Sequence, residues 1–527
     1  MSTAAPQRVR DAAGYGRDSH RWWVLVVVTI GTLMTILDST VVNIALPKLM
    51  SVFATTINGA QWVLTSYLLA LAIVIPLTGF LQETFGGKRV YIITLTLFTI
   101  ASALCGVAWS MGVLIFFRVL QGLGGGLIQP IGMSMVLSEF PPKERGTALS
   151  LIGIPLMLGP ALGPTLGGYL VQYVDWRLIF YINVPIGILG VIAASRILHG
   201  SETDRSKKLD PWGIALVAIG SAALLLGVDY GPTDGWGATN VVAEIAIGVV
   251  SLVAFVWVEL SIDEPLLDLR LFRTPQFSIA VVVTLIIQIA LFGAIFLLPL
   301  FLQNLRGLGA MQTGMMLIPQ SLAVAIVMPI SGRVFDRFGP TVVLVPGLIL
   351  LTISTYMLGN LDLNTSNSFI IWDLVLRGVG MGLAMMPAMT CAMNAVSREA
   401  IPRATALTNA LQRIAGSFGT AIMATVLTTR QTYQFAMAAQ TVTPSSPGVQ
   451  TVLANVRELA VAGHVPVAMA QQLGVLAIYQ QVATTAAVRS FDDTFLFAAV
   501  VCIPSVLVAL FVRNPPQRKG GPAMMLE

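Results

Sequence analysis

The first apolar run of the chain is WWVLVVVTIGTLMTILDSTVVNIAL, residues 22–46. An α-helix needs about 20 mostly apolar residues to cross the roughly 30 Å of hydrocarbon in a bilayer, so this run is long enough to span a membrane. Its single charged side chain is Asp38. Because an ionised carboxylate inside a membrane is costly, Asp38 is also the first candidate for a functional residue.

The rest of the sequence is similarly apolar. Of its 527 residues, 56% are hydrophobic and only 10% are charged, which is more apolar surface than a soluble core needs. Residues 1–21 are polar and contain no apolar stretch typical of a cleavable signal peptide, so we expect residues 22–46 to be retained as a helix. Cys105, Cys391 and Cys502 lie within apolar runs without a Cys-x-x-Cys pair, which indicates packing rather than metal binding.

Polar breaks divide the chain into fourteen apolar segments. The predicted membrane-spanning helices are residues 22–46, 60–81, 89–109, 112–136, 146–170, 177–198, 211–229, 240–260, 277–301, 313–333, 341–360, 369–394, 404–428 and 493–513. An even number of spans places both termini on one side. With that side taken as the cytoplasm, 21 of the 30 Lys and Arg residues fall in inside segments, six fall outside, and Arg118, Arg377 and Arg413 lie within spans. This bias predicts that both termini lie in the cytoplasm. We expect the membrane to be the bacterial inner membrane.

The two ends of the chain repeat each other. Residues 79–86, 121–127 and 145–149 resemble residues 332–339, 377–383 and 403–407, at shifts of 253, 256 and 258 residues. Three matches in one order indicate two related six-helix halves with two helices inserted between them, although apolar helices also resemble one another by chance. We therefore expect an all-α membrane protein. Its predicted parts are a tail at 1–21, a first half at 22–198, inserted helices at 199–265, a second half at 266–513 and a tail at 514–527.

One long polar break, residues 429–490, lies on the predicted outer side of the second half. Its Pro, Ser and Gln residues and short amphipathic stretches favour small helices that lie on the membrane or on the protein. Such a segment is suited to docking a partner, but a passive loop explains it equally well.

Five motifs give the chain a family resemblance. They are residues 37–47 (LDSTVVNIALP), 79–89 (GFLQETFGGKR), 118–122 (RVLQG), 159–168 (GPALGPTLGG) and 176–187 (WRLIFYINVPIG). Together they resemble the major facilitator superfamily, and most closely its fourteen-helix drug:proton antiporters of the EmrB/QacA type. The resemblance implies export of lipophilic small molecules in exchange for protons, without a cofactor, and permits a periplasmic adaptor protein as a partner. The sequence departs from the usual loop motif at Glu83, where Asp is common, and at Thr84, where a basic residue is common.

Asp38 and Arg118 are the predicted proton-coupling residues. Counted from the outer ends of their helices, Asp38 lies about eight residues in and Arg118 about six, so both lie roughly 9–12 Å below the outer surface and can meet. Burial raises the proton affinity of a carboxylate and a nearby cation lowers it, so a partner that moves can switch proton uptake to release. The resemblance assigns the matching Arg to the proton relay. An Asp bonded through Thr40 or Asn43, or a static ion pair, stays open as an alternative.

Two further sets of residues are candidates for gating. They are Gly79, Glu83, Gly86, Lys88 and Arg89, matched by Asp336 and Arg337 in the second half, and Gly159, Pro160, Gly163, Pro164 and Gly167. We expect the first set to latch the helices at the cytoplasmic side, although positive-inside anchoring explains its basic residues as well. The second set predicts a bent, smooth helix face suited to two halves that rock across each other. The resemblance assigns that face to antiport; plain tight packing explains it equally well.

The candidates for a substrate cavity are Asn43, Gln121, Gln288, Arg377, Met385, Met386 and Arg413. Asp373 lies four residues before Arg377, so a local ion pair is the expected state of that arginine. Arg413 has no such partner nearby in the sequence. Methionines can pack around dissimilar ligands, although they more often fill gaps between helices. Within the spans we set Asp38 against Arg118, Arg377 and Arg413, with Asp373 and Glu244 near the outer ends, and this balance predicts neutral or weakly anionic lipophilic substrates rather than dications.

The sequence contains no phosphate-binding loop, metal cluster or catalytic triad, so we expect a transporter and not an enzyme, with no metal, no cofactor and no nucleic-acid partner. Alternatives with the same fold are an importer, or an exporter of one specific metabolite or lipid. An alternative of a different class is a lipid-handling or assembly protein that holds a partner through its outer loop. The motif at residues 159–168 favours export over import through the resemblance.

Overall fold

The computed structural model describes residues 18–200, 203, 210–262, 265–441, 447–462 and 467–512. Its α-helices are α2 (Asp18–Phe53), α3 (Ile57–Val74), α4 (Thr78–Phe85), α5 (Gly87–Gly106), α6 (Met111–Glu139), α7 (Arg145–Tyr169), α8 (Leu178–Tyr181), α9 (Asn183–Ile197), α10 (Pro211–Asp234), α11 (Thr239–Ser261), α12 (Pro275–Leu300), α13 (Ala310–Phe338), α14 (Thr341–Met357), α15 (Asn367–Asn394), α16 (Ile401–Thr441), α17 (Pro447–Ala462) and α18 (Val467–Ala509). Short helical turns are η1 (Ile75–Leu77), η2 (Leu170–Val174), η3 (Leu269–Arg273), η4 (Phe301–Leu305) and η5 (Leu358–Asn360). No β-strand occurs in these described ranges.

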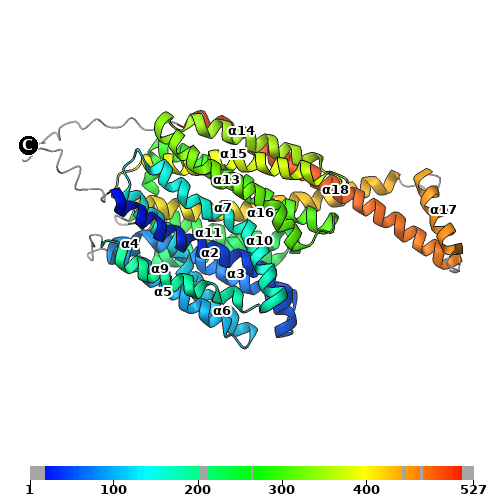
Figure 1. The fold of residues 1–527 in the computed structure, drawn as a ribbon, viewed down its shortest axis with the longest axis horizontal. Helices are drawn as coiled ribbons and strands as arrows, with labels where there is room; N and C mark the ends of the chain where they lie inside the picture. Colours follow the sequence, from blue (N-terminus) through cyan, green and yellow to red (C-terminus); the bar gives the residue numbers. More distant parts are fainter. Residues whose placement is uncertain are drawn as a thin grey trace, which may run out of the picture.

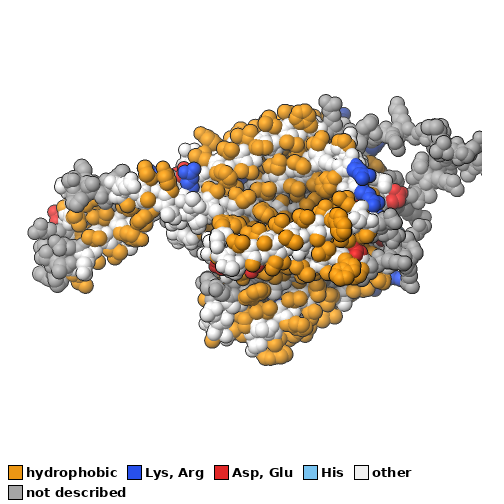
Figure 2. Space-filling model, turned by 180° about the vertical axis from the view of Figure 1, so that it is seen from behind, with side chains coloured by type: hydrophobic (Ala, Val, Ile, Leu, Met, Phe, Trp, Pro, Cys, Tyr) orange, Lys and Arg blue, Asp and Glu red, His pale blue; other side chains and the backbone are white. Residues whose placement is uncertain are grey.

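Thirteen helices among the described residues are long and apolar enough to cross a membrane. They correspond to thirteen of the predicted spans, and the predicted span at 146–170 corresponds to α7. The wall of the bundle is covered with hydrophobic side chains, and charged ones gather toward its ends (Figure 2). On α11, for example, Val250, Val253 and Trp257 are all exposed. An apolar outer wall of this kind suits lipid contact, and the predicted all-α membrane fold is confirmed.

The helices lie side by side in one elongated bundle (Figure 1). We call α2–α9 the first half and α12–α18 the second half. The halves meet along α7 and α13, which pack against each other. The inserted helices α10 and α11 form a pair, and α10 packs against α3 of the first half and α16 of the second. The inserted pair therefore contacts both halves.

Glycines allow the helices within each half to approach closely. A Cβ added at Gly122 of α6 would lie 2.7 Å from the Tyr67 carbonyl oxygen of α3, and one at Gly124 would lie 2.8 Å from the Thr94 carbonyl oxygen of α5. Small residues at such crossings bring backbones together in a membrane, where no hydrophobic effect drives helices into contact. This packing fixes α6, which carries Arg118, against its neighbours.

The glycine row of α7 packs within its own half. Gly159, Gly163 and Gly167 lie against Ile36, Thr40 and Val41 of α2. Thr40 Oγ1 also donates to the Gly159 carbonyl oxygen at 3.3 Å. This corrects the expectation that the row forms a face between the two halves, because α2 and α7 belong to the same half. Pro160 and Pro164 lie within α7, but their side chains are not among the described ones.

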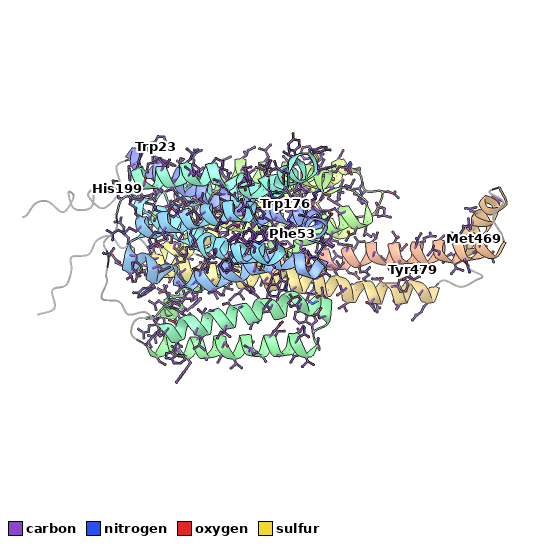
Figure 3. The ribbon with its side chains drawn as sticks, turned by 90° about the horizontal axis from the view of Figure 1, so that it is seen from below. Trp23, Phe53, Trp176, His199, Met469 and Tyr479 are labelled. Atoms are coloured by element: carbon purple, nitrogen blue, oxygen red, sulfur yellow. The ribbon has the colours of Figure 1, made fainter. Side chains whose placement is uncertain are left out.

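The outer segment 429–490 also differs from expectation. Instead of small helices at the surface, α16 continues unbroken to Thr441 and α18 begins at Val467; only α17 is a separate short helix. Residues 420–441 contain neither Pro nor Gly, so nothing ends α16 at the predicted boundary. These extensions and α17 form an outer hairpin that projects beyond the bundle (Figures 1 and 3). Its two arms touch where the rings of Phe435 and Tyr479 lie 5.5 Å apart.

Candidate functional site

Asp38 and Arg118 form a buried ion pair. Arg118 Nη1 on α6 donates to Asp38 Oδ2 on α2 at 2.6 Å. Both side chains are fully buried. The contact between these residues, which their depth in the two helices predicted, is present.

Two side-chain amides complete the surroundings of Asp38. Gln121 Nε2 and Asn183 Nδ2 donate to Asp38 Oδ1 at 2.9 and 2.8 Å. Gln121 Oε1 in turn accepts from Arg118 Nη1 at 2.8 Å, one helical turn away on α6. Asp38 thus has three donors and needs to donate to none of them, which is the arrangement that fits an ionised carboxylate.

The other side of Arg118 packs on α3. Its Nε donates to the Val63 carbonyl oxygen at 3.1 Å, and its guanidinium carbon lies 4.1 Å from the centre of the Tyr67 ring. The Tyr67 side chain is within electrostatic range of Asp38, Arg118 and Arg413. Tyr67 therefore contacts the ion pair from α3, a helix that also lines the cavity described below.

The sequence did not single out Asn183 or Tyr67 as part of this site. Asn183 stands in the motif at residues 176–187, and a polar amide in an apolar stretch was the available signal. Tyr67 offers no such signal, because a tyrosine in a membrane helix is common. Contact with Arg118 depends on the crossing of α3 and α6, which a linear pattern does not specify.

A cavity of about 310 Å³ lies between the two halves. It is lined by α3, α6 and α7 of the first half, α12, α15 and α16 of the second half, and α10 of the inserted pair. Of the seven cavity candidates, Gln288, Met385, Met386 and Arg413 line it. Asn43 is exposed elsewhere on α2, and Gln121 belongs to the Asp38 cluster. Arg377, the third candidate outside the lining, is described below.

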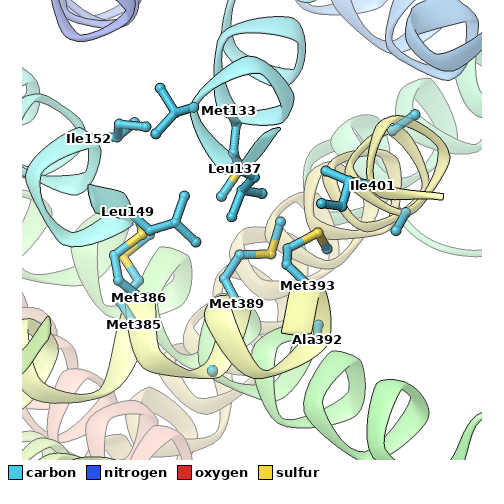
Figure 4. Close-up of a cluster of buried hydrophobic side chains, with 14 of the residues drawn as sticks. Met133, Leu137, Leu149, Ile152, Met385, Met386, Met389, Ala392, Met393 and Ile401 are labelled. Carbon is cyan, nitrogen blue, oxygen red and sulfur yellow. The ribbon is translucent and has the colours of Figure 1, made fainter. Parts of the chain in front are cut away.

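Methionines form much of the wall on the second half. Met385, Met386 and Met389 of α15 line the cavity, and Met133 of α6 lines it from the first half. Figure 4 shows these side chains together between the two halves. Met393, one turn further along α15, is fully buried against Thr405. The cavity wall is therefore adaptable, while Met393 fills a gap between helices.

Two opposite charges face the cavity. Arg413 of α16 and Asp229 of α10 both line it, and both side chains are exposed to it. Within the described part of the chain, neither side chain has a hydrogen bond or an ion pair, either with the other or with a third residue. Asp229 was missed from the sequence because it falls on the last residue of the predicted span 211–229, where it read as a boundary.

The expected ion pair between Asp373 and Arg377 is not formed. Both residues are buried on α15, yet Asp373 Oδ1 and the Nε and Nη2 atoms of Arg377 have no hydrogen-bond partner. Asp373 Oδ2 instead accepts from Ser354 Oγ of α14 at 3.1 Å. The spacing of four residues allowed the pair, but the neighbouring helix supplied a competing donor. The prediction of a local pair is therefore wrong for this conformation.

Two acidic side chains cross between the halves at one end of the bundle. Glu83 of α4 accepts from Arg403 of α16 at 2.9 and 3.0 Å in a two-bond contact. Asp336 of α13 accepts from the backbone N–H groups of Gly146 and Thr147, at 3.0 and 2.9 Å, at the start of α7. Glu83 and Asp336 occupy matching places in the internal repeat, so each half supplies one acidic side chain that binds the other half. We call this the latch end of the bundle.

The other gating candidates also lie at the latch end, and of these only Gly79 is seen here to contact the other half. Lys88 Nζ donates to the Ser195 carbonyl oxygen of its own half at 2.8 Å. Arg89 and Arg337 are exposed. Gly86 adopts a φ of 86°, which favours glycine at this turn, and Gly79 packs against the backbone of Arg403.

One group of residues at this end has the donors that a metal ion needs. His20, Glu139 and His199 bring one ligand atom each within 4.8 Å of one another, and His199 lies at the end of the bundle opposite the outer hairpin (Figure 3). Two imidazoles and a carboxylate suit zinc and similar metals. Sequence spacing did not predict this group, because its members are far apart along the chain.

Known proteins resemble this chain over most of its length. A family model described as Major Facilitator Superfamily matches residues 28–420. The chain is 35% identical over 492 residues to the uncharacterized MFS-type transporter YhcA of Bacillus subtilis, covering 93% of this chain and 92% of that one. It is 31% identical over 504 residues to the multidrug export protein EmrB of Escherichia coli, covering 94% and 96%. It is 34% identical over 415 residues to a multidrug resistance protein B homolog of Mycobacterium tuberculosis, covering 78% and 76%.

Solved structures share the fold. The proton:xylose symporter XylE superposes with a TM-score of 0.59 at 14% identity, covering 95% of this chain and 97% of that one. The human organic anion transporter MFSD10 superposes with a TM-score of 0.58 at 14% identity, covering 92% and 99%. Together with the family match and the relatives above, this likeness shows that the chain belongs to the Major Facilitator Superfamily of membrane transporters.

Proposed function

We propose that this transporter exports lipophilic small molecules from the cytoplasm in exchange for protons. The observation that carries the proposal is the buried pair of Asp38 and Arg118. A carboxylate at this depth is costly unless it is protonated or paired, so it has two states that the protein can exchange. Asp38 holds the proton, and Arg118 expels it when the pair forms.

The surroundings of the pair support a link to the cavity. Arg118 lies over the Tyr67 ring on α3, and Thr65 and Leu68 of the same helix line the cavity. A ligand that shifts α3 therefore changes the balance between paired and separated Asp38. Such mutual influence between two sites is what exchange of substrate for protons requires.

We place the latch end in the cytoplasm, because the basic residues of the chain concentrate in the segments on that side. The contacts of Glu83 with Arg403, and of Asp336 with the start of α7, then close the cytoplasmic side. In the proposed cycle the latches open to admit substrate from the cytoplasm or the inner leaflet. Proton uptake by Asp38 from outside resets the carrier for the next molecule.

Export and substrate class rest on two supports. The relative EmrB is a multidrug export protein, and the motif at residues 159–168 is the one that the family resemblance associates with antiport. The cavity has a mostly apolar wall, which favours lipophilic molecules, and Arg413 in that wall favours an acidic group on them. An importer or an exporter of one metabolite shares the fold, so a substrate panel in energised vesicles, with and without a collapsed proton gradient, separates these functions.

The decisive test is Asp38→Asn in proteoliposomes under a proton gradient. We expect proton-driven transport to fall to the rate of protein-free liposomes, because an amide cannot exchange a proton, while substrate binding persists. Asp175→Asn is the matched control, since Asp175 is exposed and its carboxylate, among the described residues, bonds to Arg177 alone. Undiminished proton-driven transport by the Asp38 variant would overturn the proposal.

The outer hairpin supports contact with an adaptor protein. Tyr433, Met437 and Leu476 are exposed on it, beyond the end of the bundle. Deleting the hairpin and joining α16 to α18 tests its role. Full transport by the isolated deletion variant, with loss of export only in cells, indicates an adaptor contact; loss of transport in proteoliposomes indicates that the hairpin serves the carrier itself.

A further inference from the structure

The inserted helix α10 is part of the cavity wall. Leu225, Leu226 and Asp229 line the cavity, and α10 packs between α3 and α16. Helix α10 therefore forms the part of the cavity wall between α3 of the first half and α16 of the second half. A helix in this position contacts any molecule that the cavity holds.

Asp229 is the chemically informative residue of this wall. An acidic side chain within a membrane-spanning helix is costly and normally faces a partner or a wet cavity. Asp229 faces the cavity and, among the described residues, has no hydrogen bond or ion pair. Arg413, on the other side, is also unpaired in the described part of the chain. The cavity thus holds two opposite charges that do not neutralise each other.

The two charges stand at different depths. Leu224 and Val228 of α10 pack with Ile414, Phe418 and Ala421 of α16, which puts Asp229, the residue after Val228, near the later part of this stretch. Trp236 Nε1 donates to Thr425 Oγ1 at 2.9 Å, in the same register. Arg413 lies five to eight residues before Phe418 and Ala421 on α16, which is roughly 8–12 Å along the helix axis at 1.5 Å per residue.

We propose that Asp229 binds the cationic end of amphoteric substrates whose anionic end is bound by Arg413. The proposal rests on the proposed function only in taking this cavity as the substrate site. The favoured ligand is an elongated lipophile with a basic group at one end and an acidic group at the other. Each end then meets an unpaired charge of opposite sign, and the apolar middle meets Leu225, Leu226 and the methionines.

Three dyes with one aromatic frame provide the probes. A rhodamine with a free carboxylate carries both charges, its methyl ester carries only the cation, and fluorescein carries only anionic charge. Binding is measured by fluorescence polarisation on the full chain in detergent, without a proton gradient. We expect the amphoteric rhodamine to bind more tightly than either of the other dyes.

The variants separate the two ends. Asp229→Asn is expected to weaken binding of the rhodamine and its ester by about 10-fold or more, with fluorescein unchanged, since charge-assisted hydrogen bonds have this magnitude. Arg413→Gln is expected to weaken binding of the rhodamine and of fluorescein and to leave binding of the ester unchanged. Asp234→Asn and Arg430→Gln are the controls, because both residues lie outside the cavity on the same two helices.

Two results would overturn the assignment. In one, Asp229→Asn weakens the binding of all three dyes equally; in the other, it weakens the binding of none. Failure of the export proposal has a different signature, since proton-driven transport is then absent while the charge-selective pattern of binding remains. Loss of the pattern with intact proton-driven transport of neutral substrates refutes only the role of Asp229.

Discussion

Arg118 and Arg377 are buried arginines on α6 and α15, helices that the internal repeat relates, but their surroundings differ. Arg118 donates to Asp38, Gln121 and the Val63 carbonyl oxygen. Arg377 has no hydrogen-bond partner at Nε or Nη2, and Asp373, one turn earlier, leaves one oxygen unpaired.

The difference assigns different tasks to the two halves. Arg118 also leaves its Nη2 atom without a partner, but it is paired with the opposite charge of Asp38. A buried charge with a charged partner can be held, released and restored as a switch. A buried charge without partners is tolerated only when water or another conformation supplies them. We therefore expect proton coupling to reside in the first half, whereas Arg377 responds to conformation without carrying the proton.

The largest expected effect is on stability. Arg118→Gln leaves Asp38 buried without its cation and is expected to destabilise the protein by about 3–5 kcal/mol, the usual cost of breaking a buried pair. Arg377→Gln breaks no ion pair and is expected to cost less than about 1 kcal/mol. Thermal unfolding in detergent measures both. Equal losses of stability in the two variants would contradict the proposed difference between Arg118 and Arg377.

A double variant sharpens the same test. Asp38→Asn combined with Arg118→Gln removes both charges, so most of the loss caused by Arg118→Gln alone should be recovered. If the double variant is as unstable as the single one, Arg118 matters through packing on Tyr67 rather than through Asp38.

A smaller difference is expected for the neutral partners. Asn183→Ala removes donors to Asp38 and to Ser102, and should cost about 2 kcal/mol. Ser354→Ala removes one hydroxyl contact from an incompletely paired Asp373 and should cost at most about 1 kcal/mol. Thermal unfolding in detergent again measures both losses of stability. A larger loss for Ser354→Ala would mean that the second half depends on its polar site more than the first.

At the latch end each half supplies one acidic side chain that binds the other half, so the two variants are expected to have equal effects. Glu83→Gln and Asp336→Asn each weaken one latch, and each should raise the open fraction by about tenfold, which corresponds to roughly 1.4 kcal/mol. Ser150 is fully buried on α7, so the labelling rate of Ser150→Cys by a maleimide, with the three native cysteines replaced, reports this opening. Unchanged labelling in either variant removes that latch from the mechanism.

The sequence was informative where physical rules act locally. Hydropathy located the spans, and counting residues from the helix ends predicted that Asp38 and Arg118 lie at a similar depth in the membrane. The matching places of Glu83 and Asp336 also followed from the repeat, although their partners, Arg403 and the start of α7, did not.

The wrong predictions concern contacts that are determined by the packing of neighbouring helices. Spacing alone paired Asp373 with Arg377, but Ser354 on α14 supplied another donor. Spacing put three glycines on one face of α7, but only the fold shows that this face meets α2. Asp229 became visible only when α10 was placed against the cavity. Side-chain partners across helices depend on packing angles that no single-helix pattern contains.

The continuity of α16 has a mechanical consequence. This one helix carries Arg403 at the latch, Arg413 in the cavity and Arg430 at the base of the outer hairpin, and it ends at Thr441. Its 41 residues make a rod about 60 Å long. Each degree by which the second half tilts about the latch moves the far tip by about 1 Å. A tilt of the second half that opens the latch is therefore expected to displace the tip of the outer hairpin, at the opposite end of the bundle.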